Sequence, residues 1–245
     1  MSKFIGLICA WGVENWIELA ITQALSFCDE VIVSVGAHCE GVKKYEDKTL
    51  EICKSFGDKI KLVGVEYTGQ HNTTKAYTMN AMLKSSEIFD VGNWVFLLDV
   101  DEFYHKTDIE NLKTKIEDYN SVMVCSKIFI RGMKQYVKGE HYRMWKITNK
   151  DCDFRPTNRW TGETNPQYKS EHIMFHYTFL LDPNMKMDFW KEEYAGKAQN
   201  EKVDWMKNVY LKDVKFTLGP HDFGYGETLY ELQGKHPDII EKSKL

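Results

Sequence analysis

Two aspartates at the end of an apolar segment are the residues of this 245-residue chain best suited to chemistry. The segment 94–98 reads WVFLL, and Asp99, Val100 and Asp101 follow it directly, with Glu102 beside them. Side chains two apart in a strand point the same way, so Asp99 and Asp101 would project together while Val100 turns into the core. Carboxylates this close raise each other's pKa unless a cation separates them, and hard divalent cations prefer oxygen ligands. The pattern therefore predicts a divalent metal site, although a strand that ends in solvated acids is the simpler alternative.

The elements that must position these aspartates alternate between strand and helix. Short apolar runs predict strands and amphipathic stripes predict helices. The strands are expected over 4–10, 30–35, 59–67 and 94–99, and the helices over 14–27, 45–56, 74–88 and 107–119. This alternation favours an α/β fold with a mostly parallel central sheet and helices on both faces. Ligands of such sheets bind beyond the carboxyl ends of the strands, where Asp99 and Asp101 fall.

The second half of the chain has a different character, because all five prolines lie there. Residues 121–130 and 171–180 read as strands, 155–169 as a long polar loop, and 188–211 as a helix. No Gly- or Ser-rich linker separates the halves. We expect one domain over 1–245, with a nucleotide-binding half (1–125) and an acceptor-binding half (126–245) that is elaborated by C-terminal helices.

Composition narrows the class of protein further. The net charge of −4 gives no overall basic field that would indicate nucleic acid. The six cysteines show no CxxC pairing and read as small buried residues of a reducing compartment. No apolar stretch approaches the roughly 20 residues that span a bilayer. The sequence therefore favours a cytoplasmic protein.

The acidic motif and its surroundings resemble the GT-A glycosyltransferases, and within them the family 2-like group. The resemblance rests on Asp99-Val100-Asp101, which looks like the DxD motif of that group, within the phrase WVFLLDVDEF. It extends to the following segments: Gly6-Leu7-Ile8-Cys9-Ala10 with Glu14-Asn15, Asn72-Thr73-Thr74-Lys75-Ala76 with Asn80, Phe175-His176-Tyr177-Thr178, and Gly234-Lys235-His236-Pro237. It implies a GT-A fold and the transfer of a sugar from a nucleotide-sugar donor.

The resemblance also implies a metal, Mn²⁺ or Mg²⁺, on the donor diphosphate. Charge grows on the departing phosphate, and a bound ion stabilises it. Asp101 is the expected direct ligand, and Asp99 would touch the ion through water or hold the ribose or sugar. His176 would complete the metal site, with His172 and His236 as alternatives. Alternatively, His176 could be a structural strand residue whose ring only forms a hydrogen bond with a backbone carbonyl.

A UDP-sugar is the expected donor, and its binding residues are expected to be Trp11, Glu14, Lys75, Asp99 and Val100. Trp11 could stack on a base or cap the core, and Lys75 could meet a phosphate or lie on a helix surface. The segment 35–41, VGAHCEG, departs from the acidic, Gly/Ser-rich turn usual in that group. The contacts to base and ribose are therefore left open.

Transfer with inversion needs a general base beside the acceptor hydroxyl. Glu163, in the polar loop beside Trp160 and Gly162, is the candidate. Glu171, Asp151 and Asp153 are alternatives. Each of these acids could instead be an ordinary loop residue exposed to solvent. A retaining enzyme would need no such base.

The segment 127–150 bears on the acceptor, because it holds seven basic residues against one acid, with aromatic residues between them. Cations that neutralise phosphates, with aromatics that stack on bases, are typical of nucleic-acid binding. The acceptor could therefore be a saccharide or a modified base in a nucleic acid. Two ordinary strands with solvated lysines would give the same pattern.

Two other functions compete with glycosyl transfer. A nucleotidyltransferase shares the sheet, but it usually opens with a Gly-rich basic loop, where this chain has Trp11-Gly12-Val13-Glu14. A non-catalytic module would bind a nucleotide-sugar without transferring the sugar. Stabilisation by a nucleoside triphosphate alone would favour the first, and binding without sugar release would favour the second.

Overall fold

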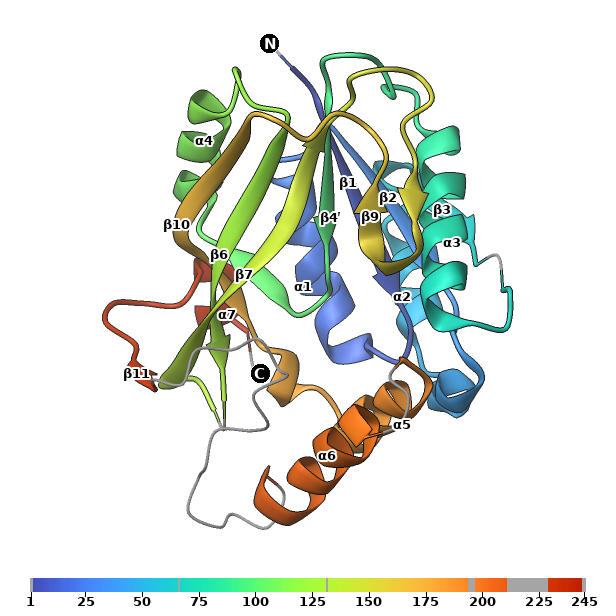
Figure 1. Ribbon diagram of the computed structural model, residues 1–245, viewed down its shortest axis with the longest axis vertical. Coiled ribbons are helices and arrows are strands. Elements are labelled where there is room, and N and C mark those ends of the chain that lie inside the picture. Colours follow the sequence, from blue (N-terminus) through green and yellow to red (C-terminus); the bar gives the residue numbers. More distant parts are fainter. Residues whose placement is uncertain (1, 66, 131, 194–196, 211–228, 244–245) are drawn as a thin grey trace.

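The central feature of the computed structural model is a nine-stranded sheet covered by helices on both faces (Figure 1). The structure describes residues 2–65, 67–130, 132–193, 197–210 and 229–243. The strand order is β3-β2-β1-β4-β7-β6-β10-β5, and β11 pairs with β7. The α/β architecture expected from the sequence is confirmed.

The first half of the sheet is parallel and almost wholly apolar. It comprises β1 (Phe4–Ala10), β2 (Glu30–Val35), β3 (Lys61–Gly64) and β4 (Trp94–Leu98). β1 lies between β2 and β4 and pairs with both in parallel register. Strands covered on both faces read as continuous apolar runs, which explains FIGLICA and WVFLL.

The second half of the sheet is mixed. It comprises β5 (Glu102–Tyr104), β6 (Ser121–Phe129), β7 (Gln135–Lys146), β10 (Gln167–His176) and β11 (Tyr230–Glu231). β7 is antiparallel to both β4 and β6, whereas β10 is parallel to β6 and antiparallel to β5. The last pairing brings the end of β10 beside the residues that follow Asp101.

Two separate cores cover the faces of the sheet. One face packs against α1 (Glu14–Leu25), α2 (Thr49–Ser55), α4 (Lys106–Lys115) and α7 (Asp238–Glu241). The other packs against α3 (His71–Ser85) and a small hairpin of β8 (Phe154–Arg155) and β9 (Arg159–Trp160). Both layers hold the parallel strands at fixed positions, so the turn after β4 has a firm base.

A third apolar cluster lies beyond the carboxyl ends of the parallel strands, at the bottom of Figure 1. It contains α5 (Pro183–Glu193), α6 (Lys197–Trp205) and a π-helical turn (Met206–Tyr210). A 3₁₀ segment, Glu40–Tyr45, packs against α5, and the Tyr45 hydroxyl donates to Asp188 at 2.8 Å. These elements wall the end of the sheet at which ligands are expected.

Several sequence expectations need correction. The helix expected over 107–119 begins one residue earlier and ends sooner, because α4 runs over Lys106–Lys115 with His105 as its N-cap. The polar loop over 155–169 contains the β8–β9 hairpin and the start of β10. The helix expected over 188–211 is two helices and a π-helical turn, and Leu211 lies outside the described residues. These segments are short, so they do not show the regular spacing of apolar residues from which longer helices and strands are predicted.

Candidate functional site

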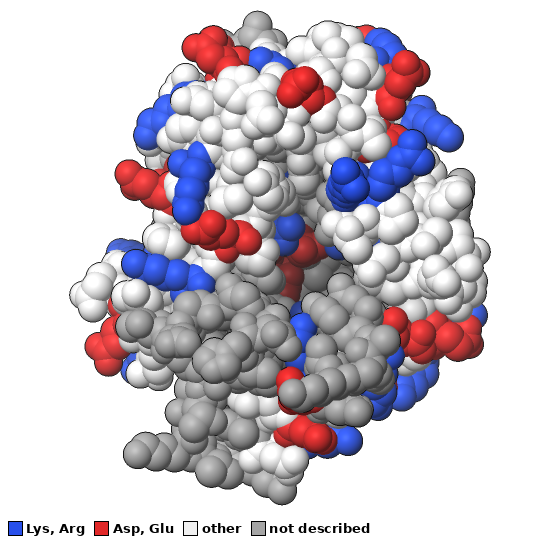
Figure 2. Space-filling model, viewed as in Figure 1, with Lys and Arg blue, Asp and Glu red and all other residues white. Residues whose placement is uncertain are grey.

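The acidic motif forms a tight turn between β4 and β5, at the carboxyl end of β4. The Tyr177 backbone N–H donates to the Asp101 carbonyl at 2.8 Å, so the end of β10 holds this turn in place. Val100 is buried in the core, as expected. The turn lines a cavity of about 390 Å³, and Figure 2 shows a hollow near the centre of this face with acidic and basic atoms inside it. We call it the donor cavity, after the nucleotide-sugar donor that the sequence resemblance leads us to expect there.

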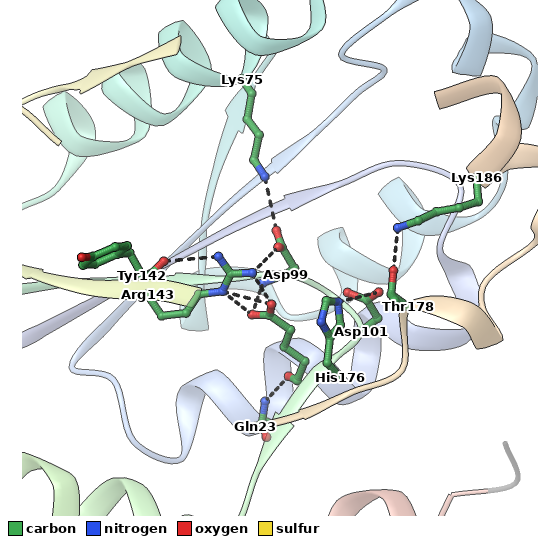
Figure 3. A network of polar contacts seen from close by, with 10 residues as sticks. Gln23, Lys75, Asp99, Asp101, Tyr142, Arg143, His176, Thr178 and Lys186 are labelled. Carbon is green, nitrogen blue, oxygen red and sulfur yellow. Dashed lines mark hydrogen bonds and ion pairs between the residues drawn. The ribbon is translucent and has the colours of Figure 1, made fainter. Parts of the chain in front are cut away.

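Asp99 lies between two cations of the protein (Figure 3). Its Oδ1 is 3.4 Å from the Lys75 Nζ on α3, and its Oδ2 is 2.9 Å from the Arg143 Nη2 on β7. Burial alone would raise the pKa of Asp99, but Lys75 and Arg143 outweigh that effect and hold it well below its usual range. Asp99 is therefore an ionised carboxylate whose charge is compensated by side chains.

Arg143 also binds Glu102, the acid that follows the motif. Its Nε donates to the two Glu102 carboxylate oxygens at 3.0 and 2.8 Å, and its Nη2 also contacts Glu102. Glu102 is fully buried, and the Asp99 N–H donates to its Oε2 at 3.4 Å. One guanidinium therefore ties together the two acids that flank the turn.

Gln23 on α1 fixes the same segment from the other side. Its Nε2 donates to the Glu102 carbonyl at 3.0 Å, and its Oε1 accepts from the Tyr104 N–H at 2.6 Å. Gln23 is buried, so neither bond competes with solvent. The position of the motif thus depends on side chains from α1, α3, β7 and β10 (Figure 3).

Asp101 is buried beside His176, the last residue of β10. The His176 Nε2 lies 3.5 Å from the Asp101 Oδ2, and the His176 Nδ1 is buried with no hydrogen-bond partner among the described residues. Burial raises the pKa of Asp101, but His176 and Lys186 together bring it below its usual value. Lys186 on α5 donates to the Thr178 hydroxyl at 2.5 Å and lines the same cavity.

The donors for a metal ion are few. In the described part of the chain, no group of three or more His, Cys, Asp or Glu side chains is arranged to hold an ion. Asp101 and His176 supply two donors, and the buried His176 Nδ1 has no hydrogen-bond partner among the described residues. Ions on substrate phosphates are commonly held by one or two protein carboxylates, with phosphate oxygens and water completing the shell. The residues present fit an ion of that kind.

The predicted donor-binding residues divide into two groups. Trp11, Lys75, Asp99 and Val100 line the donor cavity, and the Trp11 indole is fixed by a 2.7 Å bond to the Val42 carbonyl. Glu14 does not line it, because its carboxylate accepts from the Lys48 N–H at 3.1 Å and joins α1 to the start of α2. The sequence placed Glu14 near the site but could not show which way it points.

The alternative histidine ligands lie elsewhere. The His172 Nδ1 is 3.3 Å from the Ser126 carbonyl, and His236 bonds to the Tyr177 hydroxyl and the Met133 carbonyl. Neither histidine lines the donor cavity. His176 is thus the candidate histidine that the fold brings to Asp101.

Glu163 is exposed and lines neither cavity described here. Its carboxylate accepts from the Asn165 N–H at 3.4 Å, within its own loop. Among the alternatives, Asp151 and Glu171 are also exposed, and Asp153 pairs with Arg155 at 3.3 Å. The structure therefore gives no support to the expectation that Glu163 faces an acceptor.

Three neutral histidines of the donor cavity were not singled out from the sequence. Burial, with help from Lys75, lowers the pKa of His38 to about 4 and that of His71 to about 3. Burial and Arg143 lower the pKa of His141 to about 3. Each ring has a buried nitrogen without a hydrogen-bond partner among the described residues, so a ligand could satisfy it.

The basic residues of 127–150 do not form one basic surface. Arg143 is buried against acids, as described above. Three lysines lie over aromatic rings: Lys127 over Phe175, Lys138 over Tyr230 and Lys146 over Trp94. Lys150 pairs with Asp90, and Arg131 lies outside the described residues. These cations are spread along the whole length of β7 and beyond it.

A second cavity of about 870 Å³ adjoins the first, and we call it the hairpin cavity. His141 and Arg143 line both cavities. The β8–β9 hairpin supplies much of the remaining wall, with Tyr142 and Trp145 from β7. The two cavities therefore share a part of their walls on β7, next to the acidic turn.

Comparison with known proteins identifies the class. Residues 44–182, more than half of the chain, match the model of glycosyl transferase family 2. The chain belongs to this family and has its GT-A-like fold. In the described residues, no helix is long and apolar enough to cross a membrane.

Solved structures similar to this chain include two of TarS from S. aureus. The first is 12% identical with a TM-score of 0.48, over 84% of this chain and 43% of that one. The second, TarS 1–349, is 14% identical with a TM-score of 0.48, over 84% of this chain and 71% of that one. This chain thus spans less than half the length of the first.

Proposed function

We propose that this protein transfers a sugar from a UDP-sugar to an acceptor hydroxyl in a reaction that depends on Mn²⁺ or Mg²⁺. The observation that supports this best is the pair of Asp101 and His176 at the floor of the donor cavity. Beside this pair, Asp99 is kept ionised by Lys75 and Arg143. A diphosphate placed here would meet two metal-binding side chains and the ammonium of Lys186.

The chemistry of the leaving group explains these charges. When the bond from the sugar to the nucleotide breaks, negative charge grows on the β-phosphate, and fixed positive charges stabilise it. The bound ion would supply Lewis-acid stabilisation of that charge. Lys186 would contribute a second positive charge from α5. Asp99, whose charge is already compensated, is suited to accept hydrogen bonds from sugar or ribose hydroxyls.

Inversion at the anomeric carbon is part of the proposal. Direct displacement needs the acceptor to approach from the side opposite the diphosphate. The donor and hairpin cavities share His141 and Arg143 in their walls, which places an acceptor next to the donor. Glu163 lies outside both cavities, so the proton of the acceptor hydroxyl would pass instead to the neutral His141, whose buried Nε2 has no hydrogen-bond partner among the described residues. The division into a nucleotide-binding half (1–125) and an acceptor-binding half (126–245) is part of the same proposal, with His176 and Lys186 of the second half also lining the donor cavity.

A cytoplasmic location is also proposed, because UDP-sugars are made there and the cysteines show no CxxC pairing. Cell fractionation tests this location.

Nucleotide-dependent thermal stability tests the function. UDP, GDP and CDP are added with and without Mn²⁺, and a ligand that binds the native state raises the unfolding temperature. UDP should give the largest shift, and that shift should need the metal. A panel of UDP-sugars is then assayed for UDP release. Equal shifts with and without metal, or none with any nucleoside diphosphate, would refute the proposal.

Asp101→Asn and Glu163→Gln form a matched pair of variants for this test. Each removes one carboxylate charge at nearly constant size. Asp101→Asn should abolish the metal-dependent shift, whereas Glu163→Gln, exposed and outside the cavities, should keep it and should keep UDP release within about twofold. A metal-dependent shift that survives Asp101→Asn would remove Asp101 from the metal site.

A further inference from the structure

Two arginines lie opposite each other in the small hairpin that walls the hairpin cavity. Arg155 of β8 and Arg159 of β9 are cross-strand partners in the antiparallel register, and both line this cavity. Like charges directly opposite each other in a strand pair are destabilising. An anion between the two guanidinium groups would turn that repulsion into attraction, because guanidinium forks match carboxylates and phosphates.

The hairpin is held in place by specific contacts. The Asn80 side chain on α3 donates to the Phe154 carbonyl at 2.8 Å and accepts from the Phe154 N–H at 2.7 Å. Phe154 and Trp160 are buried, and both pack against Trp145 of β7. The arginine pair is therefore presented by a fixed scaffold.

The charge of the hairpin cavity is positive. Glu140 is the one carboxylate among the described residues that line it, and Lys169 compensates that charge at 2.6 Å. Arg155 is paired with Asp153 at 3.3 Å, but 64% of its side chain stays exposed. Arg159 forms an ion pair with no carboxylate of the described residues. The exposed Tyr142 adds an aromatic surface to the same wall.

We infer that the hairpin cavity binds the acceptor, and that this acceptor is a saccharide carrying a phosphate or a carboxylate, held by Arg155 and Arg159. This inference rests on the proposed function, since it gives the second substrate of that reaction a place and a charge. A saccharide is favoured over a nucleic acid because the two exposed arginines, Arg155 and Arg159, lie together at one cavity. A nucleic acid needs a row of cations, and those of 127–150 are engaged or spread apart.

Binding of simple sugars tests the inference. The probes are glucose, glucose 6-phosphate and glucuronate, which share a ring and differ in charge, together with a 12-nucleotide single strand of DNA. Affinity is measured by titration, and the NMR signal of the Trp160 indole N–H reports on the hairpin cavity. At least one anionic sugar should bind about tenfold or more tightly than glucose and shift that signal. Preference for glucose 6-phosphate would show that the site binds a phosphate, and preference for glucuronate would show that it binds a carboxylate.

Charge-removal variants locate the effect. Arg155→Gln with Arg159→Gln should abolish the preference for anionic sugars. Lys150→Gln, which removes an exposed cation outside the cavity, should keep the preference. Equal affinity for all three sugars, or a preference that survives the double variant, would overturn the inference. So would DNA that binds more tightly than either anionic sugar and is lost in the double variant.

Both substrates are measured on the same samples, so the two proposals can fail separately. The double variant should keep metal-dependent UDP binding. If UDP binding fails in the wild-type protein while the anionic-sugar preference holds, the proposed donor is wrong and the anion site remains. If UDP binds as expected and the preference for anionic sugars is absent, this inference is refuted and the proposed function is not affected.

Discussion

Arg143 and Glu102 form a buried ion pair that joins the middle of the sheet to the strand after the acidic motif. The Arg143 Nε donates to both Glu102 carboxylate oxygens, at 2.8 and 3.0 Å, and neither side chain has appreciable exposure. Burial raises the pKa of Glu102 and Arg143 opposes that rise, so Glu102 depends on this one partner for its charge. The same guanidinium reaches Asp99, which couples the stability of the fold to the donor cavity.

Replacement of Arg143 by Met should therefore be severe. It leaves the buried Glu102 without its cation and Asp99 with Lys75 alone, and loss of one partner of a buried pair costs about 3–5 kcal/mol. Urea unfolding measures the change in the free energy of unfolding. The deficit should shrink as the pH falls, because protonation of Glu102 removes the uncompensated charge.

A double-mutant cycle identifies the cause. Glu102→Gln removes the buried charge, so Arg143→Met should cost much less in that background than in the wild type. Additive effects of the two substitutions would show that the pair does not act as a unit. Metal-dependent UDP binding, measured on the same proteins, reports separately on Asp99.

The buried histidines of the donor cavity should make stability depend on pH. His38 and His71 have pKa values of about 4 and about 3 in the fold, below the ordinary 6.5. Between these values the unfolded chain binds more protons than the folded one, so stability falls as the pH drops from about 6.5 toward 4. Each histidine contributes a slope of up to about 1.4 kcal/mol per pH unit.

His38→Gln tests that linkage, because the glutamine amide can form hydrogen bonds in place of the imidazole but does not titrate. The slope of unfolding free energy between pH 6.5 and 4.5 should become shallower by up to about 1.4 kcal/mol per unit. The unfolding free energy is obtained from urea titrations at each pH. An unchanged slope would mean that His38 titrates alike in the folded and unfolded states.

Lys186→Met should weaken donor binding while the fold stays intact. The Lys186 ammonium lines the donor cavity and lowers the pKa of Asp101, so it lies where a diphosphate would carry charge. Its loss should raise the Kd for UDP about tenfold, which corresponds to about 1.4 kcal/mol. Calorimetric titration in Mn²⁺ measures the effect.

Lys191→Met is the control on the same helix. Lys191 is paired with Asp188 at 2.6 Å and does not line the cavity. Its replacement should leave UDP affinity within about twofold. Equal losses in both variants would point to a general effect of charge on α5, and no loss in Lys186→Met would separate Lys186 from the donor.

The acidic motif was predictable because two short-range rules agree on it. An apolar run that ends in charged residues marks the end of a buried strand, and alternation with helices places that end at the ligand-binding edge of the sheet. Both rules use only neighbours in sequence. The strands over 4–10 and 30–35 were predicted to the residue for the same reason.

Arg143 was assigned to a basic stretch because its burial depends on a pairing that local sequence does not encode. β7 runs antiparallel between β4 and β6, so alternate residues turn toward the acidic turn. The alternation of Val137, Gly139, His141 and Arg143 was a usable signal for one face of the strand. Without knowledge of the neighbouring strand, the sequence does not show whether that face points to the core or to solvent.

Lys186 and the hairpin arginines come from segments whose sequences carry no periodic pattern. The hairpin depends on Asn80, 74 residues before Phe154, whose side chain takes the place of a backbone partner. Long-range bonds of this kind specify structure in a segment that composition alone marks as a loop.

The carboxamide of Gln23 has a consequence for how the border of the sheet is closed. β5 is the last strand of its sheet, and such a border has backbone groups that no further strand can pair. Gln23 occupies one carbonyl and one amide of that border, two residues apart, much as a neighbouring strand would. Because Gln23 and β5 are buried, a glutamine-to-leucine change would leave both groups covered and without a partner, and the expected result is a lower unfolding temperature.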